Sequence, residues 1–513
     1  MKRLIPLLLA LLKFFIGYLL GSGAYELQRD EYLYLNMGHH LAWGFIEVPP
    51  LLAAQAWLTQ ALGGGYVWVK FWPFLWGALT IYLVARLTQK LGGGWFAVVL
   101  AGTCYLASGF ARLNFLFQPN SFEVLAFTAV SYALVRYWQR PRPGYLYAAG
   151  VVLGLSLLNK YTTFFFLAAV LGAVLLTPHR RLLTTRPFWS AAALVLLLFL
   201  PNLIWQLRHG IPFLNHMSEL HGTQLVHVSV ADFWKDQLLM CFPAVWVWVP
   251  GLLALLLYRK FRPFRAVGWL YLLGLGILTV LHGKSYYALG YYPLLFAFGA
   301  LWLERQLSRL RGARYVQPVV AALPVLIMLP LLPFVYPVLS PAPMQEFGAR
   351  YRDLGMLRWE DGEDHALPQD YADMLGWQEL ADKTYAAWQA LPAATRPRTL
   401  IVCANYGQAG AINYFNRNRL MPEAHSRNGS YLYWWPDLTA LASFEHVILV
   451  DDEPDDDVPA LFARYSRAGT IGNPYAREKG TAIGVGTGPG PAVLPRIRRE
   501  HQAALAVWEG KKW

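Results

Sequence analysis

The sequence predicts a polytopic α-helical membrane protein with about eleven transmembrane helices and a C-terminal soluble α/β domain. Three observations predict this class. Hydrophobic residues make up 56% of the 513 residues and charged residues only 15%, whereas a globular protein carries roughly 25% charged residues. Apolar segments that approach the ~20 residues of a membrane span recur up to residue 338. Beyond residue 340, amphipathic stretches and Gly/Pro-rich turns replace them.

Composition also excludes two other classes. The net charge of +13 does not indicate nucleic-acid binding, because the basic residues lie in short clusters between apolar segments, as the positive-inside rule predicts. The three cysteines form neither a disulfide framework nor a zinc motif. The 21 Trp and 29 Tyr suit the aromatic belts at the two membrane interfaces.

The first apolar segment, residues 4–20, follows Met1-Lys2-Arg3. It resembles a signal peptide, but no convincing small-x-small cleavage site follows it, the nearest being Gly21-Ser22-Gly23-Ala24. We therefore expect an uncleaved first helix that starts in the cytoplasm. The further expected spans are 66–86, 94–111, 120–137, 145–159, 161–177, 188–206, 238–258, 266–282, 286–303 and 317–338.

Charge between the segments predicts the orientation of the chain in the inner (plasma) membrane. The expected cytoplasmic loops hold Arg86, Lys90, Arg136, Arg140, Arg142, Arg180, Arg181, Arg186, Arg259, Lys260, Arg262, Arg265, Arg305, Arg309, Arg311 and Arg314. The expected outer loops hold far fewer: Arg29, Arg112, Arg208, Lys235 and Lys284. This alternation predicts a cytoplasmic N-terminus and a C-terminus outside the cytoplasm.

Two domains follow from this layout. A transmembrane domain covers 1–339 and has two long outer loops, 24–65 and 207–237. An extracytoplasmic, periplasmic α/β domain covers 340–513. Within it, the hydrophobic pattern predicts a helix over 377–391, a strand over 399–403, a helix over 409–415 and a strand over 446–450.

The candidate acids lie in the first outer loop. Asp30 and Glu31 follow the first span by about ten residues, and Glu47 precedes Pro49-Pro50, which favours the start of a helix. The simpler interpretation is a solvated pair and a helix-capping acid. However, carboxylates close to lipid are costly, and such residues are usually functional.

The candidate cations lie between apolar runs on the expected outer side. Lys160 and Lys284 break the charge rule there, which indicates an anionic ligand, although Lys160 is equally compatible with snorkelling to the interface. In the second outer loop, His216 and His221 flank Glu219. Histidine beside a carboxylate suits a metal, but the spacing matches no strong motif.

Several segments resemble glycosyltransferase family 39 of the GT-C superfamily, the group of protein O-mannosyltransferases and the bacterial lipid A aminoarabinose transferase. The resemblance rests on Asp30-Glu31, on 45–51 (FIEVPPL), 154–162 (GLSLLNKYT), 284–287 (KSYY) with Tyr292-Pro293, and 404–410 (ANYGQAG). It covers the whole chain, and the fold it implies is GT-C-like.

The resemblance implies a polyprenyl-phosphate sugar as donor and transfer on the outer face to a lipid, glycan or protein acceptor. It implies a catalytic role for Asp30 with Glu31 beside it, and a divalent metal ion at Glu47. It also implies that Lys160 and Lys284 contact the donor phosphate. The sequence departs from the lipid A branch at Val48, where that branch has a lysine, so the acceptor stays open.

The remaining site predictions complete a hypothetical inverting mechanism. Arg208 would join the phosphate contacts. Tyr32, Tyr286 and Tyr287 would contact substrate, and His216 and His221 are candidate metal ligands. Two other classes compete with this interpretation: a transporter or flippase of envelope substrates, and a non-catalytic assembly subunit. Transporters usually place ionisable residues near the bilayer midplane and often have internal repeats, whereas these acids and lysines lie at predicted segment ends.

Overall fold

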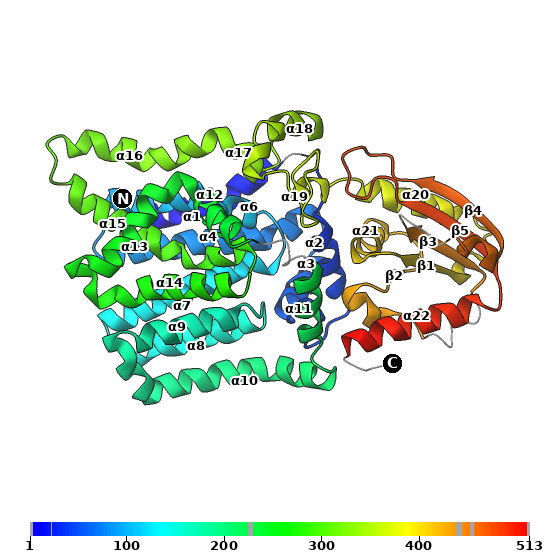
Figure 1. Ribbon diagram of the computed structural model, residues 1–513, viewed down its shortest axis with the longest axis horizontal. Coiled ribbons are helices and arrows are strands. Elements are labelled where there is room, and N and C mark those ends of the chain that lie inside the picture. The colour runs from blue at the N-terminus through cyan, green and yellow to red at the C-terminus, as the bar shows by residue number, and fades with distance from the viewer. Residues whose placement is uncertain (1–3, 22, 224–228, 438–443, 452–455, 510–513) are drawn as a thin grey trace. The chain divides into compact units, whose positions relative to one another are not determined.

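The computed structural model describes residues 4–21, 23–223, 229–437, 444–451 and 456–509. The chain forms two compact units (Figure 1). The membrane unit comprises residues 1–21, 67–203 and 221–338, and the C-terminal unit comprises residues 22–66, 204–220 and 339–513. The first outer loop of the sequence thus clusters with the α/β region. The predicted outer loop 207–237 includes residues 224–228, which lie outside the described residues.

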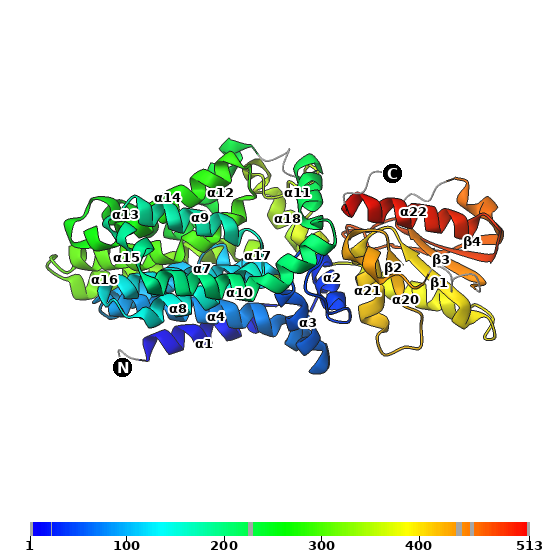
Figure 2. The same cartoon turned by 90° about the horizontal axis from the view of Figure 1, so that it is seen from below.

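The membrane unit is built from helices that run alongside one another (Figure 2). Its main helices are α1 (Ile5–Leu20), α4 (Tyr66–Lys90), α5 (Trp95–Leu106), α6 (Phe110–Leu113), α7 (Pro119–Gln139), α8 (Pro143–Leu157), α9 (Thr163–Leu175), α10 (Arg186–Arg208), α12 (Val230–Met240), α13 (Val245–Leu257), α14 (Arg265–Val280), α15 (Pro293–Leu307), α16 (Ala313–Met328) and α17 (Leu332–Val335). Short 3₁₀ helices include η1 (Pro178–Thr184), η4 (Arg259–Phe264) and η5 (Ser285–Tyr291).

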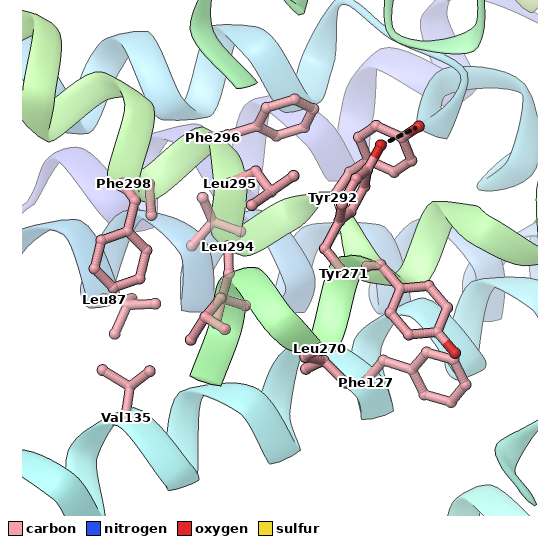
Figure 3. Close-up of a cluster of buried hydrophobic side chains, with 14 of the residues drawn as sticks. Leu87, Phe127, Val135, Leu270, Tyr271, Tyr292, Leu294, Leu295, Phe296 and Phe298 are labelled. Atoms are coloured by element: carbon pink, nitrogen blue, oxygen red, sulfur yellow. Dashed lines mark hydrogen bonds between the residues drawn. The ribbon is translucent and has the colours of Figure 1, made fainter. Parts of the chain in front are cut away.

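The core of this unit is centred on α15. Leu294, Leu295, Phe296 and Phe298 are each at most 3% exposed and belong to one cluster of buried apolar residues (Figure 3). A helix that is apolar on every side is typical of the interior of a bundle. By contrast, α10 exposes apolar side chains such as Leu197, at 66%, which is favourable only against lipid or another apolar surface.

The membrane class is confirmed at a coarser level than predicted. Among the described residues, four helical segments are long and apolar enough to cross a membrane, or up to six if each of two bent pairs is one span. The four are Tyr66–Lys90, Arg186–Arg208, Arg259–Val280 and Ala313–Val335. Other predicted spans correspond to apolar helices of 10–17 residues, such as α1, α5 and α8, which are short against the ~20 residues of a full span.

The C-terminal unit contains a mixed five-stranded sheet in the order β2-β1-β3-β5-β4. Its strands are β1 (Thr399–Cys403), β2 (Ala424–Ser426), β3 (His446–Asp451), β4 (Phe462–Thr470) and β5 (Ala482–Pro489). β1 pairs in parallel with β2 and β3, and β5 pairs antiparallel with β3 and β4. The predicted strands 399–403 and 446–450 are confirmed.

Helices cover both faces of this sheet (Figures 1 and 2). α22 (Val493–Trp508) packs Val493 and Ile497 against Leu400 and Val402 of β1. α20 (Trp377–Gln389) and α21 (Tyr406–Asn416) lie on the opposite face, which confirms the two helices expected there. The unit also contains α2 (Arg29–Met37), α3 (Leu51–Ala61), α11 (Pro212–Thr223), α18 (Pro341–Ala349), α19 (Gln369–Ala372) and η9 (Gly429–Trp434).

Candidate functional site

The acidic pair begins helix α2 and its two members have different partners. Gln28 caps the helix: its side-chain oxygen accepts a hydrogen bond from the Asp30 N–H at 2.9 Å, and its own N–H donates to the Glu31 carboxylate at 2.7 Å. Glu31 is fully buried in this capping box. The Asp30 side chain is 28% exposed. Thus the Asp30 side chain, unlike that of Glu31, is partly accessible to solvent.

Tyr406 and Arg29 hold the Asp30 carboxylate. The Tyr406 hydroxyl donates to Asp30 Oδ1 at 2.8 Å and accepts from Arg29 Nη2 at 2.8 Å. Arg29 Nε lies 3.7 Å from the same carboxylate oxygen. Burial, and the charge of Asp30, keep the pKa of Tyr406 well above its usual value even though Arg29 opposes this. The phenol therefore keeps its proton and can donate a hydrogen bond to the carboxylate.

Hydrogen bonds hold the segment that carries Tyr406. It follows β1, and the Asn405 side chain caps α21 by accepting the Gln408 N–H at 3.0 Å. The Gln408 side-chain oxygen accepts the N–H of Asn405 at 3.4 Å, which completes a reciprocal capping box, and also the N–H of Ala404 at 3.0 Å. Hydrogen bonds between side chains and backbone therefore flank Tyr406 in the first turn of α21.

Two glycines of the same segment let α2 approach α21. A Cβ at Gly407 would lie 2.5 Å from Arg29 Cγ, and a Cβ at Gly410 would lie 2.8 Å from Tyr32 Cβ. Both distances are shorter than any ordinary carbon contact. The segment 404–410, noted in the sequence for its family resemblance, thus positions Tyr406 against Asp30 and also makes room for α2.

Asp373 supports the start of α2 from behind. Its carboxylate is 1% exposed and accepts from Arg477 Nη1 at 3.2 Å and from Gln28 Nε2 at 3.3 Å. Its backbone oxygen accepts the Arg29 N–H at 3.0 Å. Burial raises the pKa of Asp373 to about 6, although Arg29 and Arg477 act in the opposite direction.

Glu47 lies at a second strand end of the same sheet. Ser430, just after β2 and inside η9, donates its N–H to Glu47 Oε1 at 2.8 Å and its hydroxyl to Oε2. The Ser430 oxygen also accepts the Ile46 N–H at 2.9 Å. Gly429 has φ +61°, and a Cβ there would lie 1.9 Å from Glu47 Oε1, so only glycine fits.

The residues around Glu47 do not fit a metal site as they are arranged. Within the described ranges, no group of three or more His, Cys, Asp or Glu could hold an ion, and Ser430 hydrogen-bonds both Glu47 oxygens. His216 and His221 lie on α11, where His216 Nδ1 is 3.9 Å from Glu219 and its ring contacts Trp508. No chemical step is therefore assigned to a metal here.

Lys160 lies in the membrane unit, in the turn between α8 and α9. Its Nζ donates to Asn120 Oδ1 at 2.7 Å and lies 3.3 Å from Glu123 Oε2. Thr162 donates to the other Glu123 oxygen. The Lys160 and Glu123 side chains are 13% and 5% exposed, so this is a largely buried ion pair.

The predicted residues of 284–287 gather around Lys160. Lys160 Nζ lies 4.1 Å from the centre of the Tyr287 ring and 5.3 Å from that of Tyr286, within the range of cation–π attraction. Lys284 precedes η5 and acts electrostatically on Lys160. The membrane unit therefore brings four of the predicted residues together.

The other predicted residues have separate surroundings. Tyr32 is fully buried between Trp377, Tyr414 and Phe415, which supports a packing role. Arg208 is exposed at the end of α10. For all of these residues the assigned roles stay predictions.

Sequence reasoning missed Glu123, Asp373 and Ser430. A carboxylate inside the apolar segment 120–137 is costly, so the sequence of this segment alone could have identified Glu123 as a candidate functional residue. Asp373 and Ser430 carried none, because their partners lie hundreds of residues away in the chain.

The fold matches solved structures of known proteins. Two structures of ArnT from Cupriavidus metallidurans, one bound to undecaprenyl phosphate and one in the apo state, align over 94% of this chain and 97% of theirs, with TM-scores of 0.60 and 0.61 at 14% and 13% identity. A family model described as dolichyl-phosphate-mannose-protein mannosyltransferase matches residues 47–205. The chain is thus similar to ArnT in fold and, over residues 47–205, to the mannosyltransferase family.

This relationship confirms the resemblance seen in the sequence. A curated relative, lipid A galacturonosyltransferase RgtD of Rhizobium johnstonii, is 26% identical over 220 residues. The match covers 40% of this chain and 44% of that relative's length. An Archaeoglobus fulgidus oligosaccharyltransferase, solved with Zn and sulfate, matches with a TM-score of 0.50 at 14% identity, over 87% of this chain and 68% of its own.

Proposed function

We propose that the protein is a membrane glycosyltransferase that moves a sugar from a polyprenyl-phosphate-sugar donor to an acceptor on the outer face of the membrane. The observation that carries the proposal is the Asp30 carboxylate, partly exposed and held by Tyr406 and Arg29. A chain with the fold of ArnT and a carboxylate held in this way has what a glycosyl transfer to a hydroxyl requires.

The reaction follows from simple bond changes. The acceptor hydroxyl oxygen attacks the anomeric carbon and forms the new C–O bond, while the bond from that carbon to the phosphate oxygen breaks. The electron pair leaves with polyprenyl phosphate, and the hydroxyl proton passes to Asp30 and then to water. Because attack comes from the face opposite the phosphate, the anomeric configuration inverts.

We assign binding of the donor phosphate to the basic residues that the sequence predicted for this role. Lys160, Lys284 and Arg208 would neutralise the leaving group, with Tyr286 and Tyr287 beside it. Lys160 has three donor hydrogens, so it can keep Asn120 and Glu123 and still offer one to a phosphate. Such preorganised charge is worth ~3–4 kcal/mol per key group in other enzymes.

The relatives guide the choice of substrates. ArnT was solved with undecaprenyl phosphate, which supports an undecaprenyl carrier for the donor. RgtD is a lipid A galacturonosyltransferase, which supports lipid A or a similar envelope glycolipid as acceptor. Val48, where a lysine is expected in the lipid A branch, leaves room for a different headgroup.

The arrangement in the membrane completes the proposal. Eleven crossings from a cytoplasmic N-terminus would put domain 340–513 in the periplasm and leave 1–339 as the transmembrane domain. A divalent metal at Glu47, with or without His216 and His221, stays a prediction. Measuring sugar transfer in the presence and absence of a metal chelator tests it.

Sugar transfer by the purified full-length protein tests the proposal. Labelled undecaprenyl-phosphate sugars would be incubated with lipid A and with envelope extract, using wild type, Asp30→Ala and Asp30→Asn. We expect transfer by wild type and a loss of at least about 100-fold in Asp30→Ala. Absence of transfer from every donor by a folded wild-type protein would favour transport or assembly.

A further inference from the structure

We propose that Tyr406 is a positioning residue for catalysis: its phenol hydroxyl orients the Asp30 carboxylate toward the acceptor. The C-terminal region would then complete the active site in the first outer loop. This inference rests on the proposed function, because it gives Tyr406 a role only if Asp30 acts on an acceptor hydroxyl.

The direction of the hydrogen bonds is fixed by chemistry. Arginine can only donate, so the Tyr406 oxygen accepts from Arg29 Nη2 at 2.8 Å. The single phenol proton is then available for Asp30 Oδ1, also at 2.8 Å. In this series of two hydrogen bonds, the Arg29 guanidinium polarises the Tyr406 hydroxyl, and this strengthens the hydrogen bond from Tyr406 to the Asp30 carboxylate.

The tyrosine is held as a positioning group must be. Its ring lies 5.0 Å from the Arg29 guanidinium, and its backbone is in the first turn of a helix with a complete capping box. Gly407 and Gly410 set the close approach of α2 to α21. Groups on rigid elements hold catalytic geometry better than groups on loops.

A purely structural role is the competing explanation, and the same helix offers a matched control. Tyr414 also belongs to α21, and its hydroxyl also donates across the unit, to the Gly64 backbone oxygen at 3.1 Å. Tyr414→Phe removes one hydroxyl and its hydrogen bond to the loop between α3 and α4, without altering any group that bonds Asp30. A loss that only reflects weaker packing would be similar in both variants.

The experiment measures kcat and KM for wild type, Tyr406→Phe and Tyr414→Phe in the full-length protein. We expect kcat of Tyr406→Phe to fall about 10- to 100-fold, the usual effect of losing a hydrogen bond to a charged group. The KM for the undecaprenyl-phosphate sugar should change less than about threefold. Tyr414→Phe should stay within about threefold of wild type in both constants.

A double-mutant cycle separates positioning from folding. In the Asp30→Asn background, Tyr406→Phe should cause less than about a threefold further loss, because the group that it orients is already altered. Equal losses from Tyr406→Phe in both backgrounds, or equal kcat values for Tyr406→Phe and Tyr414→Phe, would overturn the inference.

Two further outcomes are distinguishable. If Tyr406→Phe fails to fold, Arg29→Gln replaces it: this variant keeps the phenol but removes its guanidinium donor, and it should lower kcat with little change in KM. An unchanged kcat in Arg29→Gln would then overturn the inference. Absence of transfer by wild type itself would instead remove the proposed function, and the inference with it.

Discussion

Adjacent acids in the chain have different surroundings because α2 rotates them apart. Successive residues of an α-helix differ by about 100°. Glu31 therefore turns back to the Gln28 N–H and is buried, whereas Asp30 meets Tyr406. The spacing in the sequence could not separate the capping acid from the candidate catalytic acid, since the deciding partner is 376 residues away.

Asp373 gives the C-terminal unit a pH-dependent stability. Its pKa is raised to about 6 in the folded protein by burial, against about 3.9 in an unfolded chain. The folded state therefore binds the proton more tightly than the unfolded state. This contribution to stability is complete below pH 4 and is lost as the pH rises through 6.

We expect Asp373→Asn to remove this dependence, since asparagine keeps hydrogen bonds without titrating. The difference in thermal midpoint between Asp373→Asn and wild type should grow in favour of the variant from pH 4 to pH 7. Thermal unfolding of both detergent-solubilised full-length proteins measures it. Parallel pH curves would contradict the raised pKa of Asp373, and Asp353→Asn, which changes an exposed carboxylate, is the control.

At the scale of elements, the parallel strands explain why Asp30 and Glu47 belong to the same unit as the sheet, which is distant from them in the sequence. Parallel strands place their carboxyl ends at one edge of a sheet, where ligand-binding groups commonly gather. Tyr406 follows β1 and meets Asp30, and Ser430 follows β2 and meets Glu47. One sheet edge thus fixes both candidate carboxylates of the first outer loop.

Alanine substitutions at Gly429 and at a second glycine with positive φ, Gly480, test whether this sheet edge fixes Glu47. Gly429→Ala and Gly480→Ala both force alanine into the left-handed region, at φ +61° and +94°, which costs about 1–2 kcal/mol. Only at Gly429 does the new Cβ meet Glu47, because nothing lies within 4 Å of the site at Gly480. We expect Gly429→Ala to lose at least about 2 kcal/mol more.

The thermal midpoints of the two alanine variants measure this difference in the full-length protein. Transfer activity should fall in Gly429→Ala and stay near wild type in Gly480→Ala, since only the first displaces Glu47. Equal losses of stability in the two variants would mean that Glu47 moves without cost, and that Ser430 does not fix it.

Local pattern predicted the elements that carry strong hydrophobic signals. The strands β1 and β3 are buried along most of their length, and both were found in the sequence, as were α20 and α21. β2 has only three residues, and β4 is largely exposed and interrupted by a register shift at Arg467/Gly469. Neither offers the alternation that identifies a strand.

Site residues were predictable only where a charged side chain lay beside an apolar segment. Asp30 and Lys160 were conspicuous as charges beside apolar runs. Their partners Tyr406 and Glu123 were not assigned roles, because a tyrosine after a strand is ordinary and because the ion pair joins α7 to the separate turn between α8 and α9. Tertiary contacts of this kind have no periodicity that a single sequence can reveal.

At the scale of the whole molecule, charge placement is the strongest argument for orientation. Basic residues crowd every second loop of the expected topology, including Arg136, Arg140 and Arg142 before α8. Lysine and arginine are retained on the cytoplasmic side during insertion. The predicted odd number of crossings from a cytoplasmic start would place the α/β sheet outside, where we propose that a lipid-linked donor is used.

Single-cysteine labelling tests this orientation in intact cells. The native Cys104, Cys241 and Cys403 are free and buried, so they give little background, since a reagent in water cannot reach them. Gly144→Cys lies in the first turn of α8, next to Arg140 and Arg142, where an added Cβ has nothing within 4 Å. Ala393→Cys lies in an exposed turn of the C-terminal unit. A membrane-impermeant maleimide should label Ala393→Cys in intact cells and Gly144→Cys only after permeabilisation. The reverse pattern would put the sheet in the cytoplasm, and it would exclude an outer-face reaction because Asp30 and Tyr406 belong to that same unit.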